Sequence, residues 1–210
     1  MNNSFVNTAR LLGAGLRALL VLTALTGVLY PLAVTGVAQA FFPTEANGSE
    51  IKADGKVVGS SLIGQQAYGP DYFQPRPANG LGENSVNTQY RLILSGATNR
   101  SADNPELVKW VKEAKAKVVK DNSTADYTVE PSQVPADAVT SSASGLDPDI
   151  SPAYARIQVH RVAERNGLSV AQVEKLVEDH TDHRTLGFIG EPRVNVLELN
   201  IALRDLAART

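Results

Sequence analysis

The longest hydrophobic stretch of the chain covers residues 17–42, RALLVLTALTGVLYPLAVTGVAQAFF. No charged residue occurs within residues 18–44, and runs such as Leu-Leu-Val-Leu at 19–22 leave no polar face. A helix packed in a water-soluble domain usually keeps such a face. A bilayer core requires about 20 mostly apolar residues in a helix. The pattern therefore predicts a transmembrane helix over residues 17–42, where Pro31 is tolerated more readily than in an aqueous helix.

The charges on either side of this stretch predict its orientation. Arg10 and Arg17 precede it, and the first charge after it is Glu45. Loops rich in Lys and Arg stay in the cytoplasm. We therefore expect a single pass, with residues 1–16 in the cytoplasm and residues 43–210 outside it.

A cleaved signal peptide is the alternative interpretation of the same stretch. Residues 38–40 read Ala-Gln-Ala, which fits the small-residue pattern of a cleavage site after a basic start and an apolar segment. The apolar part is longer than the usual ~7–15 residues of a signal peptide, which favours an uncleaved anchor. Under both interpretations the bulk of the chain is exported.

Hydrophobic alternation is weak in the next part of the chain. Residues 44–55 are polar and indicate a connector, whereas the β-branched residues 56–63 predict a strand. Residues 65–81 combine Tyr68, Tyr72 and Phe73 with three prolines, which is typical of an ordered loop held by aromatic side chains. Shorter extended pieces are expected at residues 90–94 (strand or helical turn), 127–129 and 134–139.

Helical spacing of apolar residues dominates the second half. Each helix begins at a capping residue: Asn104-Pro105, Ser151-Pro152, Ser169 with Gln172, and Asn195. Residues 194–196 would alternatively begin as a strand before the last helix. We expect the first helix to end near Lys120 and the second at Gly167, a natural C-terminal cap. The fold class is therefore α+β: one transmembrane helix followed by one helix-rich exported domain with few short strands.

Composition limits what this exported domain does. The chain has 210 residues, a net charge of −2 and no cysteine. Without the two leader arginines, the exported domain has 18 basic and 22 acidic residues, and therefore a negative net charge. This charge argues against nucleic acid or an anionic membrane surface as its partner. The absence of cysteine excludes disulfides and thiol chemistry. About 165 residues remain after the span, an ordinary single-domain size.

No catalytic motif stands out. The chain contains no phosphate-binding G-x-x-x-x-G-K-[ST] run, no G-x-S-x-G elbow and no H-E-x-x-H. His180 and His183 with neighbouring aspartates resemble part of a metal site, but a pair is incomplete, and histidine is also favoured at a helix C-terminus. Asp147 and Asp149 would attract a cation or form a turn before Ser151. An exported hydrolase or metal-binding protein remains the alternative to an accessory subunit of a membrane complex.

Two sets of residues are candidates for contacts. Small residues of the span would allow close packing against a partner helix: Gly27, Ala33, Gly36 and Ala40. In the exported domain the candidates for docking or for a structural role are Tyr72, Phe73, Arg76, Asp147, Asp149, Gly187, Gly190 and Arg193.

Three long blocks resemble the C subunit of the Kdp potassium-transporting ATPase. They are GSSLIGQQAYGPDYFQPRPA at 59–78, VTSSASGLDPDISPAYARIQVHRVAERNGL at 139–168 and LVEDHTDHRTLGFIGEPRVNVLELNIAL at 176–203. The resemblance covers nearly the whole chain in order, starting with the N-terminal span. One departure is residues 99–105, NRSADNP, which replace the family's more usual Gly-Pro-containing run.

This resemblance implies a non-catalytic subunit of an ATP-driven, high-affinity potassium uptake complex. The implied partners are a channel-like potassium translocator, a P-type ATPase subunit that hydrolyses ATP, and a small single-span subunit. The resemblance further implies a requirement for assembly and activity, a chaperone-like effect that raises the ATP affinity of the ATPase subunit, and an uncleaved anchor. ATP is the only cofactor implied, and no residue of this sequence is assigned to it.

Overall fold

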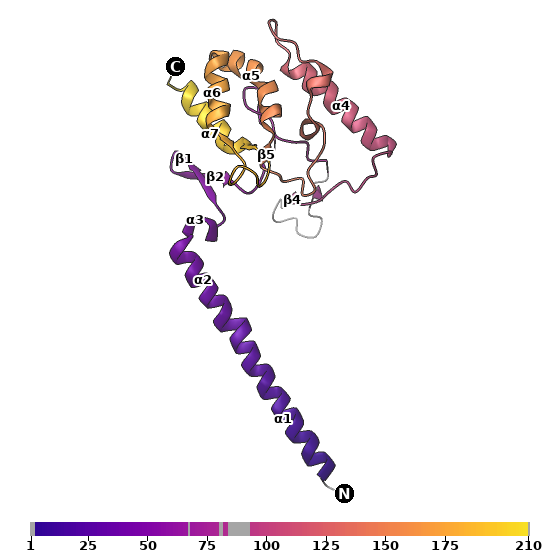
Figure 1. Cartoon of the computed structure of the whole chain (residues 1–210), viewed down its shortest axis with the longest axis vertical. Coiled ribbons are helices and arrows are strands. Elements are labelled where there is room, and N and C mark those ends of the chain that lie inside the picture. Colours follow the sequence, from indigo (N-terminus) through magenta and orange to yellow (C-terminus); the bar gives the residue numbers. More distant parts are fainter. Residues whose placement is uncertain (1–2, 67, 80–81, 84–92, 210) are drawn as a thin grey trace. The chain divides into compact units, whose positions relative to one another are not determined.

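The computed structural model describes residues 3–66, 68–79, 82–83 and 93–209. The chain divides into two compact units, Met1–Ser49 and Glu50–Thr210. The first contains a long apolar helix, and the second combines four helices of ten or more residues with short strands (Figure 1). This confirms the predicted α+β class with one N-terminal membrane-spanning helix.

The N-terminal helix is longer than its apolar part. It runs through α1 (Asn3–Ala24), a π-helical turn (Leu25–Leu29) and α2 (Tyr30–Phe41). The segment Ser4–Phe41 is the one helix in the described part of the chain that is long and apolar enough to cross a membrane. A short helix, α3 (Pro43–Ala46), follows it.

The π-helical turn explains how the helix accommodates Pro31. A proline inside a helix lacks the N–H donor and its ring collides with the carbonyl four residues earlier, here that of Gly27. The Tyr30 N–H donates to the Leu25 carbonyl, five residues back, so the turn before Pro31 is widened. The wider turn makes room for the ring without ending the helix.

The small residues of the span lie at its surface. Ala33, Gly36 and Ala40 are three and four residues apart in α2 and therefore share one face, while Gly27 lies in the π-helical turn. All four are exposed, and a Cβ added at Gly36 would meet no atom within 4 Å. Their packing against a partner helix stays a prediction.

A β-hairpin opens the second unit where a connector was expected. β1 (Glu50–Ala53) pairs antiparallel with β2 (Lys56–Ser60), which confirms a strand at the start of residues 56–63. The turn consists of Asp54 and Gly55, both at positive φ (52° and 73°), the conformation that an Asp-Gly hairpin turn requires. The Asp-Gly pair was therefore the sequence signal for β1.

α4 (Pro105–Asn122) begins as predicted, with the Asn104 side chain accepting from the N–H groups of Glu106 and Leu107. It ends at Asn122, two residues beyond Lys120. Arg100 anchors the preceding segment, which differs from the usual run of the family, to this helix. Its Nη2 lies 2.7 Å from Glu106 Oε2, and its guanidinium carbon lies 4.8 Å from the centre of the Trp110 ring.

Between α4 and the next helix the extended pieces are replaced by tighter turns. Residues 127–129 form no strand, and Ala136–Ala138 is a 3₁₀ turn, as is Pro131–Gln133. Of the predicted element at 90–94, residues 90–92 lie outside the described part, and β4 (Ile93–Leu94) pairs with β3 (Gly82–Glu83).

The remaining helices have the predicted caps. Ser151 caps α5 (Pro152–Asn166), which ends at Gly167 with φ 65°. Ser169 and Gln172 form the capping box of α6 (Val170–Asp179). α7 (Val196–Ala207) is capped by Asn195. The hydrophobic period and the cap residues were therefore sufficient to place these helices.

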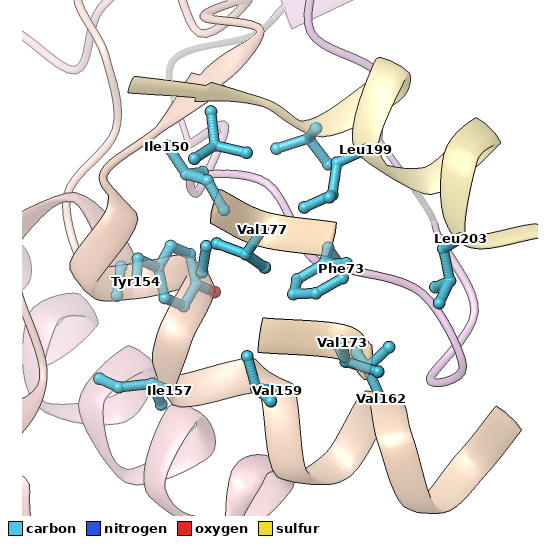
Figure 2. Packing of buried hydrophobic residues seen from close by; sticks show 14 of the residues in the cluster. Phe73, Ile150, Tyr154, Ile157, Val159, Val162, Val173, Val177, Leu199 and Leu203 are labelled. Atoms are coloured by element: carbon cyan, nitrogen blue, oxygen red, sulfur yellow. The ribbon is translucent and has the colours of Figure 1, made fainter. Parts of the chain in front are cut away.

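A small sheet and three helices enclose the core. β7 (Arg193–Asn195) lies between β5 (Asp149–Ile150) and β6 (Thr181–Asp182), all antiparallel. Figure 2 shows the Phe73 ring within the cluster that α5, α6 and α7 line. The most completely buried side chains include Phe73, Val162, Val173, Val194, Leu199 and Leu203. The loop that contains Phe73 therefore belongs to the core.

Candidate interaction surface

Two buried amide side chains hold the Tyr72–Gln74 region in place. Asn200 on α7 accepts from Phe73 N at 2.8 Å and donates to Phe73 O at 3.0 Å. Gln158 on α5 accepts from Gln74 N at 2.7 Å and donates to Gln74 O at 3.1 Å. Each amide thus replaces the strand partner that this loop lacks. We call Asn200 and Gln158 the amide clamp.

The amide clamp gives Phe73 a structural role. Its side chain is fully buried and its backbone donor and acceptor are both occupied, so it has no free surface for a partner. Tyr72 is half-buried and its ring lies 6.3 Å from that of Tyr68. Of the three aromatic residues in this loop, only Tyr68 and Tyr72 border the solvent.

Arg161 lies behind the same loop and is 6% exposed. Its guanidinium donates to Asn122 Oδ1 and Gln158 Oε1, both at 2.8 Å, and to the carbonyls of Pro70 and Tyr72. Burial lowers the pKa of Arg161 from its ordinary value, although the nearby Tyr154 and Asp121 oppose that shift. This residue joins α4, α5 and the loop.

The predicted residues Arg76 and Asp147 form a direct ion pair. Arg76 Nη1 donates to Asp147 Oδ2 at 2.6 Å, with both side chains about a quarter exposed. The other oxygen of Asp147 accepts from Asp149 N at 3.1 Å. The backbone of Asp147 also lies against Gly64, whose N–H donates to Leu146 O at 2.7 Å. Asp147 therefore connects three segments.

Asp149 and Arg193 also meet. Arg193, at the start of the central strand β7, has its Nε 3.3 Å from Asp149 Oδ2 on β5 and 3.4 Å from Asp182 Oδ2 on β6. Burial raises the pKa of Asp149, and the charge of Arg193 opposes this shift. Because Asp147 and Asp149 each have an arginine partner, their negative charge is largely neutralised where a cation would bind.

Gly187 and Gly190 shape an exposed apolar turn between β6 and β7. They have φ values of 82° and 84°, and Leu186 is also at positive φ, 55°. The Thr185 N–H donates to Ile189 O at 2.9 Å, and the Ile189 N–H donates to Thr185 O at 3.0 Å. We call residues 185–189 the apolar tip.

The apolar tip presents three large side chains to the surroundings. Leu186 is 79% exposed, Phe188 71% and Ile189 51%. At the base of the tip Arg184 pairs with Glu191 at 2.6 Å. Isolated exposed apolar residues are common, but three on one hydrogen-bonded turn are typical of an interaction site. Sequence reasoning proposed Gly187 and Gly190 for docking or a structural role but did not single out the apolar side chains beside them; the available signal was Leu-Gly-Phe-Ile-Gly at 186–190.

One of the paired histidines, His180, has a local role at the end of a helix. His180 Nδ1 lies 2.8 Å from the Leu176 carbonyl, where it closes the end of α6. Within residues 3–66, 68–79, 82–83 and 93–209 there is no group of three His, Cys, Asp or Glu residues that could hold a metal ion. The described part of the chain therefore gives no support to a metal-dependent reaction.

Sequence reasoning also missed the amide clamp and Arg161. Asn200 lies on the apolar face of α7 between Leu199 and Leu203, and Gln158 lies between Ile157 and Val159. A polar residue on an otherwise apolar helix face was the available signal. Its partners were not predictable, because Phe73 and Asn200 are 127 positions apart.

Comparisons with known proteins agree along the whole chain. Residues 12–205 match the family described as KdpC: K+-transporting ATPase, c chain. A potassium-transporting ATPase KdpC subunit of Streptomyces avermitilis is 75% identical over 99% of both chains. That of Streptomyces coelicolor is 68% identical over 99% of this chain and 98% of its own. That of Mycobacterium tuberculosis is 47% identical over 91% and 96%.

Proposed function

Because the chain belongs to the KdpC family, the c chain of K+-transporting ATPases, we propose that it is the non-catalytic accessory subunit of a high-affinity potassium uptake complex. Its role is to complete the assembly and support its activity. ATP hydrolysis belongs to a P-type ATPase subunit and potassium passage to a channel-like subunit. A small single-span subunit completes the set of proposed partners.

We propose an uncleaved anchor in the bacterial inner membrane, with the N-terminus in the cytoplasm. The continuous helix Ser4–Phe41 supports this, because none of the residues in its most apolar window is buried within the chain. Arg10 and Arg17 lie in its first part, and Glu45 follows its end. In this orientation residues 50–210 lie outside the cytoplasm.

The observation that carries the accessory role is the apolar tip. Its backbone is closed by hydrogen bonds and contains two residues at positive φ, Leu186 and Gly187, with a third, Gly190, directly after it, so it is preorganised. A preorganised turn loses little conformational freedom when a partner covers it. Leu186 and Phe188, the two most exposed large apolar side chains of residues 50–209 described, would then provide most of the binding energy.

The charges around the apolar tip favour a protein partner over lipid. Glu191 and Asp182, near its two ends, have side chains that are 80% and 71% exposed. Loops that insert into bilayers usually carry basic flanks that attract anionic headgroups. Here each carboxylate is paired with an arginine, Glu191 with Arg184 and Asp182 with Arg193, so the flanks carry no net basic charge for such headgroups. The proposed occupant is an apolar pocket on the outer surface of another subunit of the same ATPase.

An effect on ATP affinity would be indirect in this arrangement. ATP is cytoplasmic, whereas the proposed orientation places residues 50–210 on the opposite side of the membrane. We propose that docking of the apolar tip biases the conformation of the assembly, and that the nucleotide site responds to this bias. The ATPase subunit then binds ATP and no residue of this chain contacts it.

The test replaces the apolar side chains without disturbing the turn. Leu186→Asn keeps a residue that tolerates positive φ, and Phe188→Ser removes the ring. We expect the double variant to lose its partner subunits when complexes are purified from mild-detergent membranes. Val108→Ser on α4, which removes a side chain that is 37% exposed, is the matched control and should co-purify normally.

Folding of the double variant is checked by the fluorescence of Trp110, the only tryptophan of the chain. A folded double variant that retains all partner subunits would show that the apolar tip is not the docking site. Deletion of the whole chain tests the accessory role itself: intact complex assembly and high-affinity potassium uptake after deletion would overturn it.

A further inference from the structure

A cavity of about 720 Å³ lies between α4, α5 and the loop held by the amide clamp. Tyr68 and the prolines of residues 70–77 form one wall, Val118 lies on α4, and Tyr154 and Arg161 lie on α5. Small-molecule sites typically enclose about 300–1,000 Å³ and combine apolar walls with a few polar groups. The cavity has this size and this lining, and it is separate from the apolar tip.

Two hydrogen-bond donors among the residues that line the cavity lack acceptors. The Tyr68 hydroxyl and Arg76 Nε are both buried and make no hydrogen bond within the described part of the chain. Burial raises the pKa of Tyr68, and the nearby Asn200 amide, whose nitrogen already donates to Phe73 O, opposes the shift. A buried donor without an acceptor costs about 1–3 kcal/mol. A ligand that supplies acceptors would recover this cost.

Positive charge accumulates on the same lining. Arg161 is almost completely buried, and its four hydrogen-bond acceptors are neutral carbonyl or amide oxygens. These oxygens satisfy its N–H groups but do not cancel its charge. Lys120 and Arg165 at the rim have no ion pair among the described residues. Among the described residues that line the cavity, Asp121 is the one carboxylate, and it pairs with Lys117.

We propose that this cavity binds a soluble organic anion, a carboxylate or a phosphate ester carried on an apolar body. The acceptor oxygens would occupy the end near Tyr68 and Arg161, and the apolar body would lie against Pro70 and Val118. The uncancelled charge of Arg161, together with the unpaired donors of Tyr68 and Arg76, favours both oxyanions. The proposal is independent of the accessory role, because it uses neither the apolar tip nor the membrane-spanning helix.

The test uses the full-length chain in mild nonionic detergent and isothermal titration calorimetry. Phenyl phosphate is the probe, inorganic phosphate lacks the apolar body, and phenol lacks the charge. We expect saturable binding of phenyl phosphate, about tenfold weaker binding of inorganic phosphate and none of phenol. Absence of saturable binding of phenyl phosphate up to about 10 mM would overturn the proposal. Equal affinity for inorganic phosphate would overturn the apolar part of the site.

Charge-neutralising variants locate the site. Lys120→Gln with Arg165→Gln removes two rim cations, and both residues are exposed, so the fold should tolerate the change. We expect about a tenfold loss of phenyl phosphate affinity. Lys109→Gln with Lys112→Gln removes the same charge from α4 outside the cavity and should change the affinity less than about twofold. Equal losses of phenyl phosphate affinity in the two double variants would show only non-specific electrostatic attraction and would refute the site.

Tyr68→Phe separates a ligand contact from a structural role. It removes a buried hydroxyl that has no acceptor, so the unliganded chain should unfold at the same or a higher urea concentration than the wild type. The affinity for phenyl phosphate should fall about fivefold in the same variant. A variant that is less stable and binds phenyl phosphate as tightly as the wild type would assign the hydroxyl to the fold and overturn its role in the site.

Discussion

Asn200→Ala tests whether the amide clamp, rather than the Phe73 side chain alone, holds the loop at residues 68–79. The substitution removes the acceptor of Phe73 N and the donor to Phe73 O, both in a region where Asn200 is 4% exposed. The Phe73 ring itself is unchanged. Any loss of stability therefore reports on the two backbone groups that remain buried without partners.

The expected loss follows from those two groups. Each buried backbone group without a partner costs about 1–3 kcal/mol, so the free energy of unfolding should fall by about 2–6 kcal/mol. With a urea m-value of about 2 kcal/mol/M, the midpoint would move down by about 1–3 M. Water that enters the gap would place the result near the lower end of this range.

Urea denaturation of the full-length chain in mild detergent measures this change. Trp110 lies on α4 in the second unit and is the only tryptophan, so its fluorescence reports on that unit alone. Gln66→Ala, which truncates an exposed amide of the same domain, is the control and should shift the free energy of unfolding by less than about 0.5 kcal/mol. Hydrogen exchange at the Phe73 amide should become faster in Asn200→Ala.

A loss below about 1 kcal/mol in Asn200→Ala would refute the reasoning. It would mean that the Phe73 ring and its hydrophobic neighbours position the loop without help from the amide. A large loss with unchanged exchange at the Phe73 amide would also contradict it, because the destabilisation would then come from another part of α7.

Three further changes test other contacts. Gly64→Ala would place a Cβ 2.3 Å from Asp147 O, so it should lower the free energy of unfolding by about 2 kcal/mol or more. Gly69→Ala is the control, because a Cβ added there meets no atom within 4 Å. Equal losses of stability in the two variants would contradict the close approach at Gly64. Arg76→Gln and Asp147→Asn, combined in a double-mutant cycle of urea unfolding, should show a coupling of about 1–2 kcal/mol, and additive losses would show that the pair contributes nothing. Because burial raises the pKa of Asp149, the native state keeps this proton to higher pH than the unfolded chain does, and stability falls as the pH rises through the raised pKa. Asp149→Asn should remove that decrease from about pH 4 upward in a pH series of urea unfolding, and an unchanged pH profile would assign the decrease to other groups.

Local sequence signals were sufficient for the helices of the second unit and for the apolar span. Asn104, Ser151, Ser169 and Asn195 each cap a helix in the structure, because a cap depends on residues only two or three positions away. The same locality explains the β1–β2 hairpin, whose Asp-Gly turn was present in the sequence but was interpreted as part of a connector. The docking role of the predicted contact residues stays a prediction.

The hydrogen-bond partners of the loop with Phe73 could not be predicted from neighbouring residues. Aromatic residues among prolines predicted an ordered loop over residues 65–81; residues 67 and 80–81 lie outside the described part, and within residues 68–79 the backbone of Phe73 and Gln74 is held by hydrogen bonds. Its order depends on Asn200 and Gln158, which are 127 and 84 positions away from their partners. Nothing near residue 73 in the sequence indicates that amides from two different helices would replace a neighbouring strand.

The amino-acid sequence by itself determined the membrane-spanning helix, the α+β class, the capped helices and the family, because these depend on hydrophobic period, neighbouring residues or long matching blocks. Only the tertiary structure decided which of the candidate contact residues stabilise the domain and which side chains are exposed on its surface. It buried Phe73, paired Arg76 with Asp147 and Arg193 with Asp149, and left Leu186 and Phe188 exposed. The physical reason is that burial and charge pairing are set by segments distant in the chain that pack together, and no local pattern encodes that packing.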